Sequence, residues 1–143
     1  MRYPLSMPYP YEITVEVAFR DLDVLGHLNH AVYFTYMETA RTKYFVELLH
    51  LKGPQELPVI LAEATCSYHS AAFFGERLRV GVGVSRLGNK SFEMIYQITA
   101  EDGRQVATGK TVMVMYDYTN DETIPIPNEL RARIHDYQGD WSP

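Results

Sequence analysis

Residues 19–41 read FRDLDVLGHLNHAVYFTYMETAR, and within this stretch the hydrophobic pattern changes its period. Residues 11–19, which lead into it, alternate apolar and polar side chains, and this predicts a half-buried strand. From His30 to Leu49, apolar residues recur every three or four positions, which predicts an amphipathic helix of about five turns. Residues 20–29 follow neither period. The stretch therefore predicts a strand, a loop and a long helix in succession.

Strands are predicted for most of the chain that follows the helix. Their ranges are 59–69, 77–87, 91–100 and 105–117. In the last three, one face is apolar: Leu78, Val80, Val82 and Val84; Phe92, Met94, Tyr96 and Ile98; Val106, Val112, Val114 and Tyr116. The connectors are rich in turn residues, and Asp102-Gly103 is a strong hairpin signal. We therefore expect an antiparallel meander in which each strand lies beside the next.

These elements predict an α+β fold in which an antiparallel five-stranded sheet wraps around one long central helix. Residues 1–143 are expected to form a single domain. Within it, residues 1–10 form an irregular, proline-containing lead-in, and residues 126–143 form a short C-terminal helix and tail. One helix covers only one face of such a sheet. A second subunit is therefore the obvious candidate to cover the other face.

Composition excludes several classes of protein. Of 143 residues, 46% are hydrophobic and 22% are charged, which is typical of a globular domain and not of a disordered chain. No apolar run approaches the ~20 residues that span a bilayer, and no secretory signal is evident, so we expect a cytoplasmic protein without a membrane anchor. A formal net charge of −5 disfavours nucleic acid as a partner. The single cysteine, Cys66, is interpreted as a core residue and cannot form an internal disulfide.

Polar side chains gather in the loop that leads into the helix: Asp21, Asp23, His27, Asn29 and His30. The first turn of a helix carries unpaired N–H groups and a partial positive charge, and both stabilise an oxyanion. A nearby carboxylate can attack a carbonyl or activate water. Together these groups could transfer an acyl group to water.

Structural interpretations of the same residues remain open. Asp21 and Asp23 could bond the loop backbone, Asn29 could cap the helix, and His27 could satisfy loop carbonyls. Asp23, His27 and His30 could also suggest a metal site, but no fourth ligand is evident. We therefore expect neither a metal nor an organic cofactor.

The loop and helix carry a family resemblance. The pattern Asp21-x-Asp23-x-x-Gly26-His27-x-Asn29-x-x-x-Tyr33-x-x-x-x-Glu38-x-Ala40-Arg41 resembles the hot-dog-fold acyl-CoA thioesterases of the 4-hydroxybenzoyl-CoA thioesterase type. The resemblance extends over residues 11–135. It implies hydrolysis of an acyl thioester to a free acid and a thiol.

The resemblance also implies roles for particular residues. Asp23 matches the catalytic carboxylate, and His27 and Asn29 match polar positions that orient the reacting groups. The backbone N–H near His30 would hold the carbonyl oxygen, and Tyr33, close to the site, is the aromatic residue we expect to contact substrate.

Further implied contacts involve a second subunit and the carrier. The family forms homodimers, and homotetramers are the further possibility that we consider. Glu63 and Thr65 are then expected to face the partner's site. Arg86, Lys90 and Ser91 match a turn that contacts coenzyme A phosphates.

Two other functions fit the same scaffold. One is a non-catalytic module that binds acyl-CoA, because a fold does not fix a function. The other is a dehydratase acting on a 3-hydroxyacyl thioester. The chain lacks the His-Phe-Pro-Gly pattern of that branch, which argues against the dehydratase.

Overall fold

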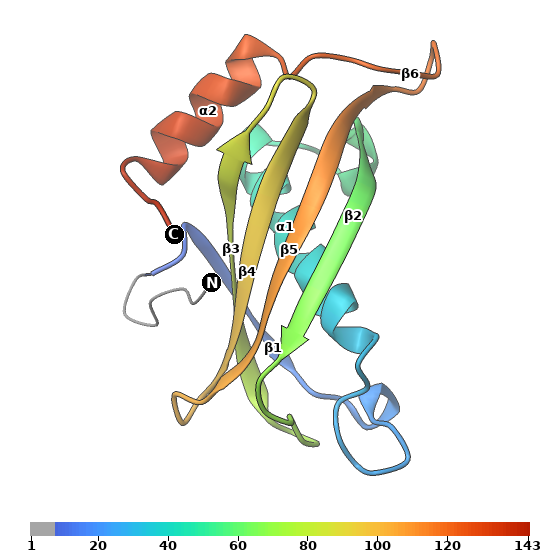
Figure 1. Cartoon of the computed structure of the whole chain (residues 1–143), viewed down its shortest axis with the longest axis vertical. Coiled ribbons are helices and arrows are strands. Elements are labelled where there is room, and N and C mark those ends of the chain that lie inside the picture. The colour runs from blue at the N-terminus through green and yellow to red at the C-terminus, as the bar shows by residue number, and fades with distance from the viewer. Residues whose placement is uncertain (1–7) are drawn as a thin grey trace.

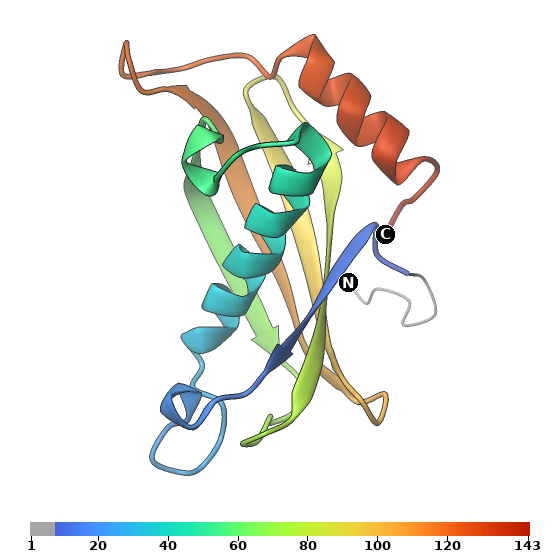
Figure 2. The ribbon, with the colours of Figure 1, turned by 180° about the vertical axis from the view of Figure 1, so that it is seen from behind.

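The computed structural model describes residues 8–143, and residues 1–7 of the expected lead-in lie outside the described part. One long helix lies across a curved antiparallel sheet, and a shorter helix packs beside it (Figures 1 and 2). The elements in order are β1 (Tyr11–Glu16), the short 3-10 helix η1 (Phe19–Asp21), α1 (Val32–Leu49), the 3-10 helix η2 (Pro54–Glu56), β2 (Val59–Tyr68), β3 (Arg77–Leu87), β4 (Ser91–Ala100), β5 (Gln105–Asp117), β6 (Glu122–Thr123) and α2 (Asn128–Gln138).

The predicted fold class is confirmed. The sheet has five main strands, and the short β6 pairs with the end of β5 as a sixth. The long helix has the predicted length, and the C-terminal helix occupies 128–138 of the predicted 126–143. No helix of the described residues is long and apolar enough to cross a membrane.

The expectation that β2 lies beside β3 is wrong. The strand order is β1-β3-β4-β5-β2, so β2 pairs with β5 at one edge of the sheet and β3 pairs with β1 near the other. The segment between β2 and β3 is not a tight turn, because it crosses the end of the sheet and pairs with the loop before α1. The N–H of Leu28 donates to the carbonyl of Ala72 (2.8 Å), and His27 forms an isolated bridge with Phe73. The crossing therefore brings the β2–β3 connection against the polar loop.

The side of the sheet that faces α1 carries most of the core. The apolar stripe of α1 is buried, and so are the predicted apolar faces of β3 and β4. The predicted face of β5 is not the one that meets α1. Met113 and Met115 are buried on the helix side, whereas Val112 and Val114 lie on the outer face and are only half-buried. Both faces of β5 are apolar, so alternation alone could not choose between them.

The outer face of the sheet is partly covered by the chain's own ends. A side chain at Gly81 would collide with Tyr9, and one at Gly83 would collide with Trp141 and Pro10. The rings of Tyr9 and Trp141 lie 5.5 Å apart, centroid to centroid. The two ends of the described chain therefore pack over β3, so a second subunit is not needed to cover that part of the sheet.

The two flanks of α1 differ. On one flank, which we call the closed flank, Tyr44 stacks on Tyr11 of β1 (centroids 5.6 Å apart) and its hydroxyl donates to Oε1 of Gln138 at the end of α2 (2.7 Å). On the other flank, which we call the open flank, Phe34, Glu38 and Arg41 of α1 border cavities that extend to β2. Figure 2 shows α1 lying between β1 and β2.

Candidate active site

Asp23 anchors a tight loop between β1 and α1. Its Oδ1 atom accepts hydrogen bonds from the backbone N–H groups of Leu25 (2.9 Å) and His27 (3.2 Å). The N–H of Gly26 donates to the carbonyl of Asp23 (3.1 Å), and Gly26 has a φ of 82°, which favours glycine. Within residues 8–143, Oδ2 of Asp23 has no hydrogen-bond partner. The loop thus orients the carboxylate through one oxygen and leaves the other available.

Asp21 has a structural role. It bonds the loop backbone, which is one of the interpretations offered by the sequence. Its Oδ2 atom accepts hydrogen bonds from the N–H of Ala18 (3.1 Å) and from the hydroxyl of Tyr36 (2.7 Å). Burial, together with the bond to this carboxylate, raises the pKa of Tyr36. Asp21 therefore ties the loop to α1.

The start of α1 is shaped by Asn29. Its side-chain Oδ1 accepts a hydrogen bond from the N–H of Ala31 (3.0 Å), and its carbonyl accepts one from the N–H of Val32 (2.9 Å). The side chain thus supports the helix start and does not line the cavity beside Asp23. Among the described residues, the backbone N–H of the intervening His30 has no hydrogen-bond partner. An unpaired donor therefore lies at the positive end of the helix.

A cavity of about 320 Å³ lies next to this loop and brings most of the predicted polar residues together. It is lined by Asp23, His27, Leu28, His30, Tyr33, Tyr68, His69, Ser70 and Ala71. Four of the predicted residues, Asp23, His27, His30 and Tyr33, are among them. Leu28 belongs to the same loop, and the other lining residues come from the end of β2 and from the connection that follows it.

Tyr68 and His69 border this cavity, but the sequence pattern did not single them out. The ring of Tyr68 packs edge-on against Tyr33 (centroids 4.9 Å apart), and its hydroxyl donates to the carbonyl of His30 (2.8 Å). Burial and the neighbouring Cys66 raise the pKa of Tyr68 to about 12. Nε2 of His69 is hydrogen-bonded to the hydroxyl of Thr108 (2.9 Å). The only sequence signal was their position at a strand end, which is too common to mark a site.

Arg104 holds the connection that lines this cavity. Its guanidinium donates to both carboxylate oxygens of Glu76 (2.8 and 2.9 Å), to Asp102 (2.9 Å), to the hydroxyl of Ser70 (3.2 Å) and to the carbonyl of Ala71 (3.3 Å). The bond to Glu76 is the main cause of the raised pKa of Arg104. Sequence reasoning missed this group, because its members come from three separate segments.

Glu63 and Thr65 are not brought to this cavity. In the register with β5 they lie opposite Val112 and Lys110, whereas Ala64 lies opposite Thr111 on the side of α1. Since side chains alternate along a strand, Glu63 and Thr65 project from the outer face, where both are exposed. Val59, Leu61 and Ala64, which border the cavities, pair with Met115, Met113 and Thr111 on the side of α1.

Arg86, Lys90 and Ser91 lie at the turn between β3 and β4, at the end of the sheet opposite the Asp23 loop (Figures 1 and 2). Arg86 and Lys90 are exposed, and the Lys90 ammonium donates to the hydroxyl of Thr123 (3.3 Å). Within one protomer, these residues and Asp23 are therefore at opposite ends of the molecule.

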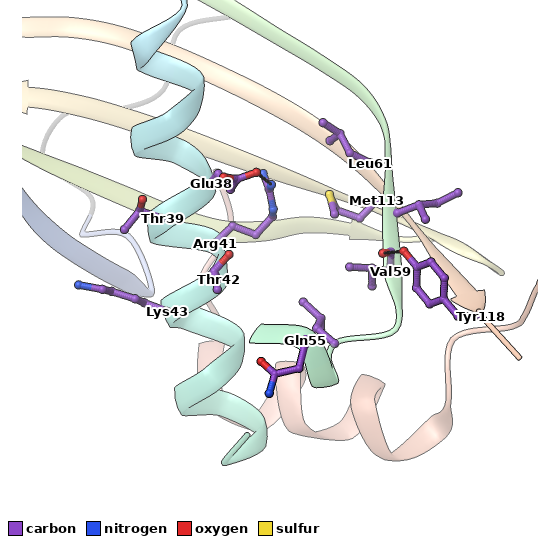
Figure 3. A pocket seen from close by; sticks show the side chains of 12 residues that line it. Glu38, Thr39, Arg41, Thr42, Lys43, Gln55, Val59, Leu61, Met113 and Tyr118 are labelled. Carbon is purple, nitrogen blue, oxygen red and sulfur yellow. Dashed lines mark hydrogen bonds and ion pairs between the residues drawn. The ribbon is translucent and has the colours of Figure 1, made fainter. Parts of the chain in front are cut away.

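A larger cavity, of about 960 Å³, follows the open flank of α1 toward η2 and β2. Figure 3 shows the side chains of Glu38 and Arg41 extending from α1 into this space, with Leu61 and Met113 across from them. Most of the sheet-side lining is aliphatic. The space therefore has an apolar wall on the sheet side and a polar wall on the side of α1.

Metal ligands are not grouped in the described part of the chain. Among residues 8–143, no three histidine, cysteine, aspartate or glutamate side chains are arranged to hold a metal ion. Two of the three histidines that line the cavity contact protein groups. His27 packs edge-on against Phe73 (centroids 5.3 Å apart), and His69 bonds Thr108.

The chain is similar to several known proteins, and those described next are named as thioesterases or as a CoA-thioester hydrolase. A crystal structure of a thioesterase from Thermus thermophilus, complexed with coenzyme A and Zn, is 34% identical with a TM-score of 0.86, over 93% of this chain and 97% of that one. A thioesterase-superfamily structure from Jannaschia is 26% identical with a TM-score of 0.82, over 97% of this chain and 91% of that one. The 1,4-dihydroxy-2-naphthoyl-CoA hydrolase of Thermosynechococcus vestitus is 28% identical over 130 residues, 85% of each chain.

The family model described as "Thioesterase-like superfamily" matches residues 17–134, which include the Asp23 loop, all of α1 and most of the sheet. The TM-scores of 0.86 and 0.82 show that the two solved structures share the overall fold of this chain. The chain therefore belongs to the thioesterase-like superfamily, has its hot-dog fold and is a thioester hydrolase.

Proposed function

We propose that this chain, working as one domain, hydrolyses acyl-CoA thioesters with the carboxylate of Asp23. One observation carries the proposal: Asp23, which keeps one carboxylate oxygen free among the described residues, and His30, whose N–H is unpaired there, line the same cavity at the start of α1. The first can act on a carbonyl carbon, and the second can stabilise the oxyanion that forms on the carbonyl oxygen.

The proposed reaction has two forms that use the same atoms. As a nucleophile, an Asp23 oxygen bonds to the carbonyl carbon, the C–S bond breaks, and the departing thiolate takes a proton from solvent. Water then hydrolyses the mixed anhydride. As a general base, Asp23 takes a proton from water while that water attacks, and the acid and the thiol are released directly. His27, at the cavity wall, would orient the carboxylate or the water.

We further propose that the active form is at least a homodimer. The outer edge of β2, 10 residues long, pairs with no strand of the described chain. Long unpaired edges favour pairing with another chain. Antiparallel pairing of two β2 strands would bring the β3–β4 turn of one protomer to the same end as the Asp23 loop of its partner. Arg86, Lys90 and Ser91 would then contact coenzyme A phosphates from across the dimer.

Release of free thiol from purified protein tests the activity. The substrates are acyl-CoAs of graded chain length and one aryl-CoA, each offered also on acyl carrier protein. The proposal expects thiol release from at least one CoA ester. Binding of acyl-CoA without thiol release would identify a binding module instead, and hydration of crotonyl-CoA would identify a dehydratase. Either result would overturn the proposal.

Mixed dimers test the contribution of the partner. Asp23→Asn protomers and Arg86→Ala/Lys90→Ala protomers are prepared separately and then allowed to exchange subunits. If coenzyme A is bound across the dimer, each mixed dimer regains one intact site, and activity rises above that of either parent. If both groups served one site within a protomer, mixing would restore nothing.

A further inference from the structure

Arg41 lies on the open flank and faces a groove whose sheet side is mostly apolar. It lines the cavity of about 960 Å³ and also a smaller one of about 140 Å³ nearer the start of α1. Glu38 and Leu61 line both cavities as well, so the two form one groove between α1 and β2. Figure 3 shows the guanidinium beside Glu38, between the helix and β2.

The guanidinium of Arg41 is buried but incompletely paired. Its side chain is 9% exposed. It donates one hydrogen bond to the hydroxyl of Tyr96 (3.2 Å), and its distance to the Glu38 carboxylate is 3.8 Å, beyond hydrogen-bond range. Within residues 8–143 it makes no other hydrogen bond or ion pair. A guanidinium has five N–H donors, so Arg41 retains donors for a ligand.

Arg104 is an arginine of the same molecule whose guanidinium is well supplied with hydrogen-bond acceptors. It is 32% exposed, yet it makes two bonds to Glu76, one to Asp102, and further bonds to a hydroxyl and a carbonyl. Arg41 is more deeply buried and has fewer partners. Burying a charge is costly unless it is paired and hydrogen-bonded. A hydrogen-bond acceptor that enters the groove would therefore bind most strongly at Arg41.

The geometry points to Arg41 as a specificity residue that binds an oxygen at the far end of the substrate's acyl group. This inference rests on the proposed function and narrows it to acyl groups that are apolar along their length and carry a terminal carboxylate or hydroxyl. The aliphatic side chains of the groove, such as Val59, Leu61 and Met113, suit the apolar part. The free N–H groups of Arg41 suit the terminal oxygen.

Distance along α1 sets the length of the acyl group. Tyr33 borders the cavity beside Asp23, and Arg41 follows eight residues later, which is about 12 Å along the helix axis at ~1.5 Å per residue. Tyr33 and Tyr68 both line the cavity beside Asp23. Tyr68 is 46% exposed, and its hydroxyl donates to the carbonyl of His30. An acyl group that passes from this cavity to the groove would require the Tyr68 side chain to rotate.

Matched pairs of esters test the inference. Decanoyl-CoA is compared with ω-hydroxydecanoyl-CoA and with sebacoyl-CoA, which has the same chain length and a terminal carboxylate. Values of kcat/KM are measured on the wild-type protein, and Kd values of the intact esters are measured on Asp23→Asn by calorimetry. We expect the oxygenated esters to be favoured by about 10- to 100-fold, the usual gain from a hydrogen bond to a charged group.

Variants assign the preference to Arg41. Arg41→Met keeps most of the volume without the charge and should abolish the preference, whereas Arg41→Lys should keep part of it. Arg133→Met is the matched control, because Arg133 is a cation on α2 that pairs with Glu129 away from the groove. The shorter pair hexanoyl-CoA and adipoyl-CoA should show little preference in the wild-type protein, since the terminal oxygen cannot reach Arg41. Because this comparison uses only the wild-type protein, it does not depend on the folding of a variant.

Three results would overturn the inference. One is equal use of the matched esters by a wild-type protein that hydrolyses both, which would leave the proposed function intact. The second is a preference that survives Arg41→Met. The third is a change of oligomeric state in Arg41→Met without a change of selectivity, which would mean that a partner subunit supplies the missing acceptor. Failure to hydrolyse any ester would instead count against the proposed function, and the Kd values on Asp23→Asn would still decide the role of Arg41.

Discussion

The two flanks of α1 are built from the same helix but differ in how completely they are packed. On the closed flank, Tyr44 is fully buried against Tyr11 and Tyr137, and its hydroxyl is bonded to Gln138. Gln138 in turn bonds the backbone N–H and carbonyl of Val84, which extends the sheet edge beyond β1. The described side chains of this flank are therefore tightly packed around Tyr44.

The open flank has a buried cation, aliphatic walls and cavities between α1 and β2. The Asp23 loop adjoins the start of the same helix. The difference indicates that the closed flank fixes the position of α1 and that the open flank is available for chemistry. Stability should therefore depend mainly on the first, and substrate use mainly on the second.

Truncation on each flank should separate stability from function. Tyr44→Ala removes a fully buried ring and should lower the free energy of unfolding by about 3–5 kcal/mol. Leu61→Ala, at a side chain that is 50% exposed, should cost less than about 1 kcal/mol. Urea unfolding followed by circular dichroism measures both. Similar losses at the two positions would contradict the contrast between the flanks.

Removing the two arginines should have unequal effects on stability. Arg104→Met leaves the carboxylate of Glu76 without its main partner and should cost about 1–3 kcal/mol. Arg41→Met replaces a poorly paired buried charge with an apolar side chain, while Glu38 remains mostly exposed to water. The unfolding free energy of this variant should therefore stay within about 1 kcal/mol of the wild-type value or exceed it. A larger loss at Arg41 would show that this charge is structural.

The smallest effect concerns tyrosine ionisation on the closed flank. Burial, and to a smaller extent Tyr137, raises the pKa of Tyr44 above the ordinary value. A raised folded-state pKa contributes stability that is fully present below the unfolded pKa of about 10 and is lost as the pH rises toward the folded value. Tyr44→Phe should lower the free energy of unfolding by about 1 kcal/mol at neutral pH, because the hydrogen bond to Gln138 is lost. Above pH ~10 the stability of this variant should fall less steeply than that of the wild-type protein. The free energy of unfolding is measured for both proteins at several pH values across this range. The same decrease with pH in both proteins would contradict the account.

The sequence predicted the fold class well because its signals are local. The period change at His30 marks the start of α1, and alternation marks β3 and β4. The position of β2 was not predicted, because it depends on how the segment after His69 crosses the sheet end. The core face of β5 was also missed, since valines on one side and methionines on the other are equally apolar.

The part of the candidate site whose residues come from one short segment could be predicted from the sequence. Asp23, His27 and His30 lie within one loop, and they do line one cavity. Tyr68 ends β2 and Arg104 directly precedes β5. The pairing of β2 with β5 places Tyr68 beside that loop and Arg104 against the β2–β3 connection. Glu63 and Thr65 were expected to face the site of a partner subunit. They are exposed on the outer face of β2 in the single protomer, so this expectation stays a prediction.

The central claim is that the carboxylate of Asp23, and not the neighbouring loop structure, carries out thioester hydrolysis. The direct test compares Asp23→Asn with Asp21→Asn in the thiol-release assay, with folding checked by thermal unfolding. Asp21 holds Ala18 and Tyr36 and does not line the cavity, so its variant should keep activity near the wild-type rate. Asp23→Asn should lose about 10²- to 10⁴-fold in kcat while remaining folded. Full activity in folded Asp23→Asn would contradict the account.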